Sequence, residues 1–123
     1  MAIVFDSDDG DGADLLEKDS PTIDDFPLTF ACWVKPEAIN DYDGLISLGT
    51  AGSAYHHIDI SLRSNSYAVA TVRGAGGASQ SVSGSSYTAG DWQHVAGTFR
   101  NSASRIVYLD GVAGAEQTPN RAA

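Results

Sequence analysis

Alternation of apolar and polar residues with a period of two most limits how this chain can fold. The segment HIDISLR divides cleanly between an apolar face, with Ile58, Ile60 and Leu62, and a polar face, with His57, Asp59, Ser61 and Arg63. Successive side chains of a strand point to opposite sides, so this pattern predicts a strand with one face in a core. The segments 27–34, 67–73, 92–99 and 105–110 alternate in the same way.

Two of these strands carry a tryptophan. In segment 27–34 both faces are fairly apolar, and Trp33 lies on the face opposite Leu28 and Val34. This pattern predicts a strand that is covered on both sides. Trp92 begins another strand and is interpreted as a buried aromatic anchor. His94 lies two residues further on and is expected to be a packed, hydrogen-bonded imidazole rather than a catalytic base.

Glycine and serine dominate the segments between the predicted strands, namely 40–44, 49–55, 63–67, 74–80, 84–91 and 100–104. Both residue types favour turns. Asp110-Gly111 predicts a tight hairpin, because a type I′ turn needs positive φ at both central residues. We therefore expect an all-β, antiparallel sandwich of about eight or nine short strands. Residues 1–123 are expected to form a single domain.

Charge and composition exclude several classes of protein. Sixteen acidic and seven basic residues give a net charge of −9, which argues against nucleic acid as a partner. No apolar run is long enough to span a membrane, and the start of the chain does not resemble a signal peptide. We therefore expect no membrane insertion. Cys32 is the single cysteine, so no disulfide forms within the chain, and a buried thiol is expected.

Four stretches, taken in order, resemble the laminin-G-like, concanavalin A-like lectin/glucanase jelly-roll family. They are IVFDSDDGDGADLLE at the start, LTFACWVKPEA, DGLISLG, and AGDWQHVAGTF followed by RIVYLDGV. The resemblance implies a jelly-roll sandwich in which Trp92, His94, Tyr108 and Asp110 are framework residues. It also implies further closing strands after the Asp-Gly hairpin, whereas this chain ends at Ala123. The resemblance therefore leaves three alternatives, which are a truncated chain, an abridged sandwich, or a neighbouring chain that supplies the missing pairing. Because an unpaired sheet edge favours association, we expect neighbouring subunits in a homo- or hetero-oligomer.

An acidic, glycine-containing segment near the start is the candidate metal site. Its carboxylates are Asp6, Asp8, Asp9, Asp11 and Asp14. Clustered carboxylates could hold Ca²⁺, which prefers oxygen ligands. An EF-hand is excluded, because Asp11 stands where that loop requires glycine and the flanking segments are predicted strands. The alternative is a solvated acidic turn.

Two aromatic segments are candidates for ligand binding. Tyr55, His56 and His57 directly precede a predicted strand, and Tyr42 lies between two aspartates. Aromatic and imidazole groups beside a sheet could contact a sugar ring. The alternatives are polar surface residues in the first segment and an ordinary turn in the second.

A catalytic role is not expected. Glucanases with this sandwich carry a Glu-x-Asp-x-x-Glu pattern, and none of the three glutamates lies in such a pattern. A nucleophile elbow and a P-loop are also missing. We expect a non-enzymatic recognition or adhesion module that binds a glycan or a protein surface through the loops or the concave face of the β-sandwich. The alternative is a structural component of an assembly, such as a phage capsid decoration or a tail or fibre protein. A virion or a cell surface is the expected location.

Overall fold

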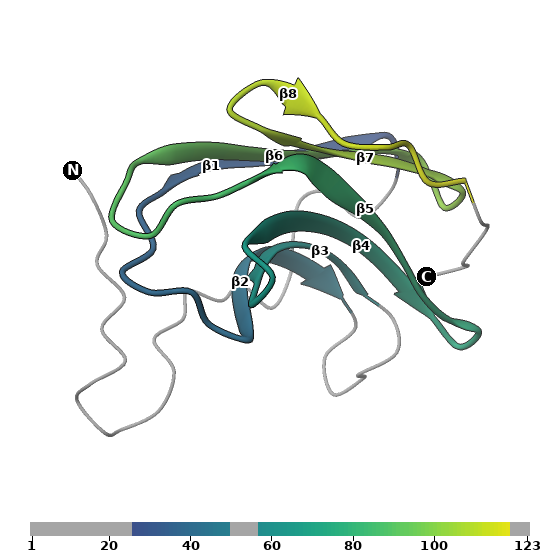
Figure 1. Ribbon diagram of the computed structural model, residues 1–123. Helices are drawn as coiled ribbons and strands as arrows, with labels where there is room; N and C mark the ends of the chain where they lie inside the picture. The colour runs from purple at the N-terminus through teal and green to yellow at the C-terminus, as the bar shows by residue number, and fades with distance from the viewer. Residues whose placement is uncertain (1–25, 50–56, 119–123) are drawn as a thin grey trace.

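A computed structural model describes residues 26–49 and 57–118, which form two antiparallel sheets stacked as a sandwich (Figure 1). One sheet has the order β1-β6-β7-β8, with bounds Leu28–Val34, Gln93–Asn101, Ser104–Leu109 and Val112–Ala113. The other has the order β2-β3-β4-β5, with bounds Tyr42–Gly49, His57–Arg63, Tyr67–Gly74 and Gly77–Ser86. The expected all-β antiparallel sandwich is confirmed. The described residues include no helix of the length and apolarity that crossing a membrane requires.

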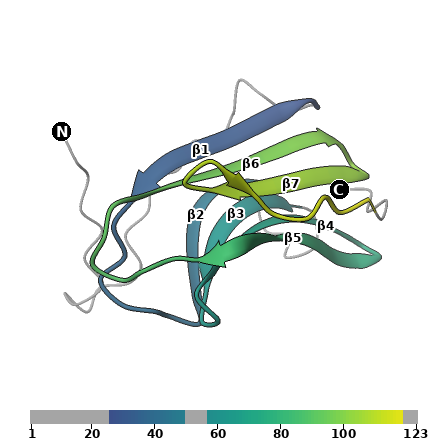
Figure 2. The same ribbon diagram turned by 45° about the horizontal axis from the view of Figure 1, so that its top comes forward.

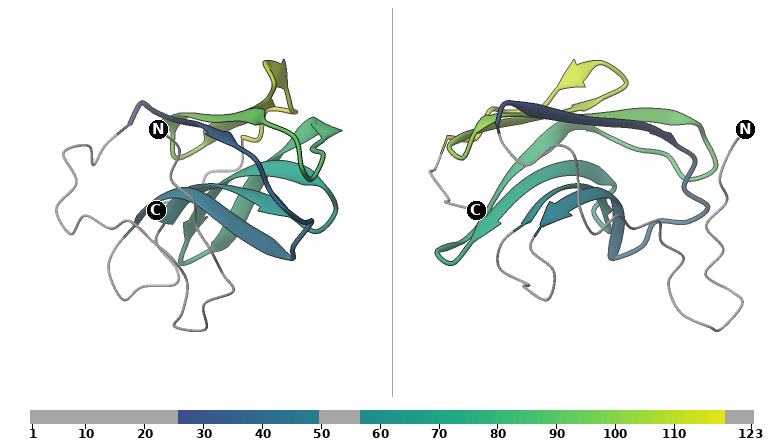
Figure 3. Two further views of the ribbon diagram at one scale, coloured as in Figure 1. Left: turned by 90° about the vertical axis from the view of Figure 1, so that its left-hand side faces the viewer. Right: turned by 180° about the vertical axis from the view of Figure 1, so that it is seen from behind.

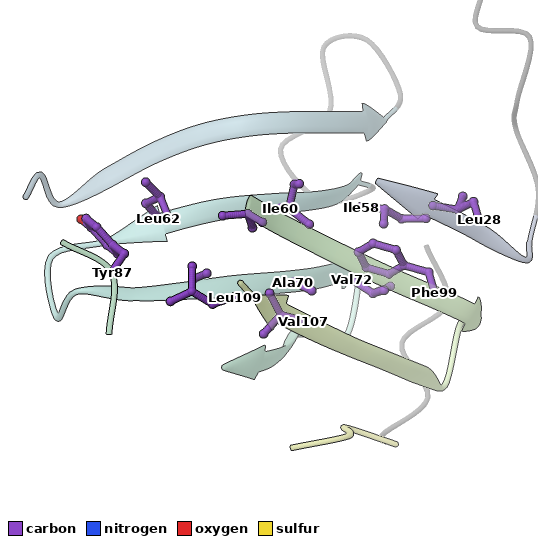
Figure 4. Close-up of a cluster of buried hydrophobic side chains, with 12 residues drawn as sticks. Leu28, Ile58, Ile60, Leu62, Ala70, Val72, Tyr87, Phe99, Val107 and Leu109 are labelled. Carbon is purple, nitrogen blue, oxygen red and sulfur yellow. The ribbon is translucent and has the colours of Figure 1, made fainter. Parts of the chain in front are cut away.

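The core lies between the two sheets and is formed by the apolar faces that the alternation predicts. From β3 it takes Ile58, Ile60 and Leu62, and from the facing sheet Phe99, Val107 and Leu109 (Figure 4). Each fully buried side chain of this size stabilises the fold by about 1.5–3 kcal/mol. Gly97 lies within this core, where an added Cβ would come 2.4 Å from Cγ2 of Ile60. The two sheets therefore approach closely at Gly97.

Strand β5, Gly77–Ser86, was not predicted. Its sequence GASQSVSGSS overlaps two segments that we interpreted as turns, because serine and glycine are common in turns. In the structure its inward side chains are the small residues Ser79, Ser81 and Ser83, all of them buried. The small side chains let β5 approach the edge of the opposite sheet, and it contacts β7 there. Figure 2 shows β5 beneath β7 and the segment that follows β8.

Serine side chains join the two sheets along this edge. The hydroxyl of Ser81 donates to the carbonyl of Ala115 at 2.7 Å and accepts from the N–H of Val107 at 3.1 Å. The guanidinium of the fully buried Arg105 donates to the carbonyl of Ser79 at 3.2 Å. The backbone at Gly114 lies so close to β5 that an added Cβ would come 2.1 Å from the carbonyl oxygen of Val82. Polar contacts and close packing thus hold β5 to the opposite sheet.

The hairpin between β7 and β8 forms as predicted. Asp110 and Gly111 have φ values of 49° and 81°, which fit a turn with two positive φ angles. The Asp110 carboxylate also accepts a hydrogen bond from the His94 N–H at 2.8 Å. The turn is therefore tied to the start of β6.

Both predictions about tryptophan burial were wrong. The side chains of Trp33 and Trp92 are 66% and 56% exposed. Trp33 lies on the outer side of β1 together with Thr29 and Ala31, which are also exposed, so this strand is covered on one side only. The imidazole of His94 packs edge-on against Trp33, with 5.3 Å between ring centroids. The core does not need the tryptophans, because the opposite faces of the same strands supply its side chains.

Candidate functional site

Strands β2 to β5 carry polar side chains on the face that points away from the core. The antiparallel register places Tyr42 opposite Arg63 and His57 opposite Arg73. It also aligns Asp59 on β3, Thr71 on β4 and Gln80 on β5 in one row across the sheet. These strands bend so that their hollow side faces away from the other sheet (Figure 3). The polar face of β3 therefore lies on the hollow side of the sheet.

A pocket of about 340 Å³ opens on this face. Its described lining residues are Tyr42, His57, Asp59, Arg63, Thr71, Arg73, Ala78 and Gln80. They come from all four strands of the sheet, and only Ala78 lacks a polar side-chain atom. A rigid sheet that presents several converging hydrogen-bonding groups is suited to orienting a polar ligand. We call this feature the outer-face pocket.

Tyr42 and Arg63 form one end of the outer-face pocket. The Arg63 guanidinium carbon lies 4.5 Å from the centroid of the Tyr42 ring, which is a cation–π arrangement. Tyr42 remains 49% exposed. Burial and the nearby charge of Asp59 raise the pKa of the Tyr42 phenol, and the neighbouring side chains of Arg63 and Ser61 only partly oppose them. The phenol therefore stays neutral at physiological pH and can both donate and accept a hydrogen bond.

Asp59 is the buried carboxylate of the pocket, with 1% of its surface exposed. Burial raises the pKa of Asp59, and the hydroxyls of Ser61 and Thr71 and the charges of His57 and Arg63 offset this effect only in part. The Nε2 atom of His57 lies 3.4 Å from Oδ1 of Asp59. Oδ2 of Asp59 is buried without a hydrogen-bond partner. This oxygen is closed off from solvent in the structure.

The other side of the pocket is lined by neutral hydrogen-bonding groups. The Gln80 amide donates to the hydroxyl of Thr71 at 3.3 Å, which orients both side chains. Gln80 is exposed, so the remaining hydrogen-bonding capacity of its amide faces solvent. Donors and acceptors thus lie side by side across β3, β4 and β5.

The structure places two of the predicted ligand residues in the pocket, and the others lie outside the residues that it describes. Tyr42 and His57 come from separate segments of the sequence, and the structure brings both into the outer-face pocket. Tyr42 is the first residue of β2, so the interpretation of its segment as an ordinary turn was wrong. Tyr55 and His56 lie outside the described residues, and so does the predicted calcium segment with Asp6, Asp8, Asp9, Asp11 and Asp14. Within the two described ranges, no three histidine, cysteine or acidic side chains gather to hold a metal ion.

Sequence reasoning missed five polar residues of the pocket. They are Asp59, Arg63, Thr71, Arg73 and Gln80. The signal for β3 and β4 was present, because their polar residues recur at every second position on one face. The neighbouring strands that complete the pocket could not be identified, because pairing and register depend on the whole sheet. Gln80 was also hidden in a segment that was interpreted as a turn.

Comparison with known proteins gives one finding on the family. The model of a laminin G-type family, described as the concanavalin A-like lectin/glucanases superfamily, matches residues 8–122. The searches of curated proteins and of solved structures gave no match.

Proposed function

Because this chain belongs to the concanavalin A-like lectin/glucanases superfamily, we propose that it is a non-enzymatic recognition module that binds a saccharide in the outer-face pocket. The family supports a binding or structural role in general. The choice of a saccharide comes from the chemistry of the pocket, in which an aromatic ring accompanies many hydrogen-bonding groups. The expected binding function therefore rests on the sheet face rather than on the loops.

The observation that carries this proposal is the convergence of Tyr42, Asp59 and Gln80 in one pocket. A sugar presents hydroxyl groups that donate and accept, together with apolar ring faces. Gln80 offers both kinds of group on an exposed amide, and Tyr42 offers a half-exposed aromatic ring and a hydroxyl. The buried carboxylate of Asp59 borders the same pocket. Preorganised side chains on strands bind such a ligand with little loss of conformational entropy.

Hydrolysis of the bound sugar is not part of the proposal. A retaining glycosidase places two carboxyl groups about 5–5.5 Å apart, and an inverting enzyme places them about 6.5–9.5 Å apart. Among the described residues that line the pocket, Asp59 is the single carboxylic acid. A single carboxylic acid lacks the second carboxyl group that either mechanism of hydrolysis requires.

Glycan-array binding followed by titration calorimetry tests the recognition function. We expect the wild-type protein to bind at least one class of oligosaccharide, and we expect Tyr42→Ala or Gln80→Ala to weaken that binding about tenfold, or about 1.4 kcal/mol. Tyr108→Ala is the matched control, because Tyr108 is a half-buried tyrosine on the other sheet. Lack of binding to every glycan, or equal losses in Tyr42→Ala and Tyr108→Ala, would contradict the proposal.

A structural role in an assembly is the second candidate. It is supported by the exposed side chains of Trp33 on β1 and of Trp92, which lies two residues before His94, the residue that pairs with Trp33. Large exposed apolar side chains that lie near one another often mark protein contacts. We propose a second copy of this chain as the occupant, since apolar contact between exposed tryptophans can bring copies together despite their net charge of −9.

Sedimentation velocity on the purified chain tests this second role. We expect a concentration-dependent oligomer that dissociates when Trp33→Ser and Trp92→Ser are combined. Val82→Ser is the control, because Val82 is an exposed apolar residue on β5. A wild-type protein that stays monomeric at high concentration would rule out self-association through the tryptophans.

A further inference from the structure

Four of the described strands lie at the edges of the two sheets, namely β1, β8, β2 and β5. The unpaired N–H and C=O groups of an edge strand can bind another strand, and proteins protect such edges with short strands, charges, bulges or cover. β8 has only two residues, and β5 is held against the other sheet by hydrogen bonds. β2 carries Asp43 and a register shift between Gly44 and Ile46. Three of the four edges are therefore protected.

β1 has none of these protections within the described residues. Its seven residues, LTFACWV, include no charged residue and no proline. Its register with β6 continues over the whole strand without a shift. Figure 2 shows β1 as the outermost strand of its sheet. A regular, uncharged strand in this position is suited to pairing with another strand.

The hydrogen bonds of His94 show which backbone groups of β6 point toward β1. The N–H of His94 donates to the Asp110 carboxylate at 2.8 Å, and its C=O accepts from the N–H of Asp110 at 2.8 Å. Both groups of His94 therefore point away from β1. Because backbone groups alternate in direction along a strand, those of the next residue, Val95, point toward β1.

The same alternation identifies the open hydrogen-bonding groups of β1. Val95 pairs with Cys32, so the N–H and C=O of Cys32 point toward β6. The N–H and C=O groups of Thr29, Ala31 and Trp33 then point toward the open edge. Within the described residues these groups have no hydrogen-bond partner. The edge therefore presents donors and acceptors in the spacing of an antiparallel strand.

β1 is complementary to a second copy of itself. In an antiparallel pair with Ala31 opposite Ala31 of the second copy, Thr29 lies opposite Trp33, and each N–H on the edge meets a C=O. The same register places Phe30 opposite Cys32 on the inner face of the sheet. Phe30 and Cys32 are packed against the core but only partly buried, so pairing would cover them further.

The charges of the chain also favour pairing at β1. Each copy has a net charge of −9, so copies repel where both present carboxylates, and β1 presents none. Lys35 follows directly after β1. In the antiparallel pair Lys35 lies beside the start of the second copy's β1, which Asp24 and Asp25 precede in the sequence. A basic group after one strand is thus complementary to an acidic pair before the other.

We propose that β1 is a self-association strand, which pairs with β1 of a second copy about a two-fold axis and joins two four-stranded sheets edge to edge. This contact is distinct from the one through Trp33 and Trp92, because it uses the edge of the sheet and leaves the outer face free. It does not depend on saccharide binding. Its seven residues per copy are fewer than the about 20–30 of a standard interface, so the dimer is weak and depends on concentration.

Amide hydrogen exchange followed by NMR tests the pairing without any substitution. The N–H groups of Thr29, Ala31 and Trp33 should exchange about tenfold more slowly at a concentration where sedimentation shows mostly dimer than in the dilute monomer. The N–H groups of Phe30 and Cys32 should be protected at both concentrations, because β6 binds them. A contact between side chains alone would not produce this alternation.

Proline at position 31 tests the edge by substitution. Ala31→Pro removes an N–H that points toward the open edge and leaves the hydrogen bonds with β6 in place, which is where an edge strand tolerates proline. We expect this variant to weaken dimerisation at least about tenfold. Ala31→Thr is the matched control, because it keeps the N–H and favours a strand. Thermal unfolding of both variants checks that the fold is retained.

The outcomes separate this inference from the roles proposed above. If the N–H of Ala31 is already protected in the dilute monomer, the edge is covered within one copy and the inference is wrong. If combined Trp33→Ser and Trp92→Ser abolish association while Ala31→Pro leaves it intact, copies meet through the tryptophans and not through β1. If the protein stays monomeric at high concentration, both modes of self-association fail and saccharide recognition stands.

Discussion

At the scale of single residues, the buried carboxylate of Asp59 lowers the stability of the folded protein. A buried carboxylate with an unpaired oxygen is unfavourable for folding, because its charge loses solvation by water. Interactions with nearby residues compensate only part of this lost solvation free energy, as the raised pKa of Asp59 indicates. Residues of this kind are retained where binding requires them, since activity and stability often conflict.

The pH dependence of stability tests this interpretation. The pKa of Asp59 is raised in the folded protein, so as pH increases the unfolded chain loses this proton first. The contribution of Asp59 to stability therefore falls as pH increases from the ordinary pKa of an aspartate, about 3.9, to its higher value in the folded state. At pH values above the pKa of Asp59 in the folded state, this loss of stability no longer changes with pH. We expect Asp59→Asn to be more stable than the wild type at neutral pH and equally stable below the window.

Urea unfolding of both proteins between acidic and neutral pH gives the required free energies. His57→Gln serves as a control for the neighbouring imidazole, which lies 3.4 Å from Asp59. If Asp59→Asn is less stable than the wild type at neutral pH, the contact between Asp59 and His57 outweighs desolvation and the interpretation is wrong.

At the scale of secondary-structure elements, the sequence predicted those strands whose apolar residues alternate. β3 was predicted with its observed bounds, and the other predicted strands that fall in the described residues differ by only a few positions. β5 was missed because its buried positions hold Ser79, Ser81 and Ser83 in place of apolar residues. The reason is physical, since buried hydroxyl groups usually need hydrogen-bond partners, and the partners of Ser81, Ala115 and Val107, lie far away in the sequence.

The hydrogen bonds of Ser81 provide a test at this scale. We expect Ser81→Ala to destabilise the protein by about 1–3 kcal/mol, because it leaves the N–H of Val107 and the carbonyl of Ala115 without this partner. Ser85→Ala is the matched control, since Ser85 is exposed on the same strand. Chemical unfolding measures both changes. Equal stabilities of the two variants would mean that water replaces the hydroxyl of Ser81.

At the scale of the whole molecule, the two sheets use their outer faces differently. The outer face of β2 to β5 carries polar and charged side chains. The other sheet exposes Trp33 on β1 and, directly before β6, Trp92. The sequence predicted the sandwich and its core, but it placed the tryptophans inside. An alternating pattern identifies the two faces of a strand, yet two moderately apolar faces do not reveal which one is buried until the second sheet is known.

Stability measurements distinguish a surface role from a core role for the aromatic residues. We expect Phe99→Ala to destabilise the protein by about 3–5 kcal/mol, because this ring is fully buried. Trp33→Ala should have an effect of only about 0.5–1.5 kcal/mol, mainly through loss of the contact with His94. Thermal and urea unfolding provide both values. A loss for Trp33→Ala as large as that for Phe99→Ala would contradict the exposed position of Trp33.

The outer-face pocket and the two tryptophans lie on opposite sides of the sandwich, which has a consequence for avidity. A copy fixed in place through Trp33 and Trp92 keeps the whole width of the molecule between its anchor and its pocket. Two copies that meet through their tryptophans would expose their pockets on opposite faces of the pair. A polymer with repeated sugar units could then link several such pairs, and such multivalent attachment can exceed the affinity of one site by a factor of about 10²–10⁴.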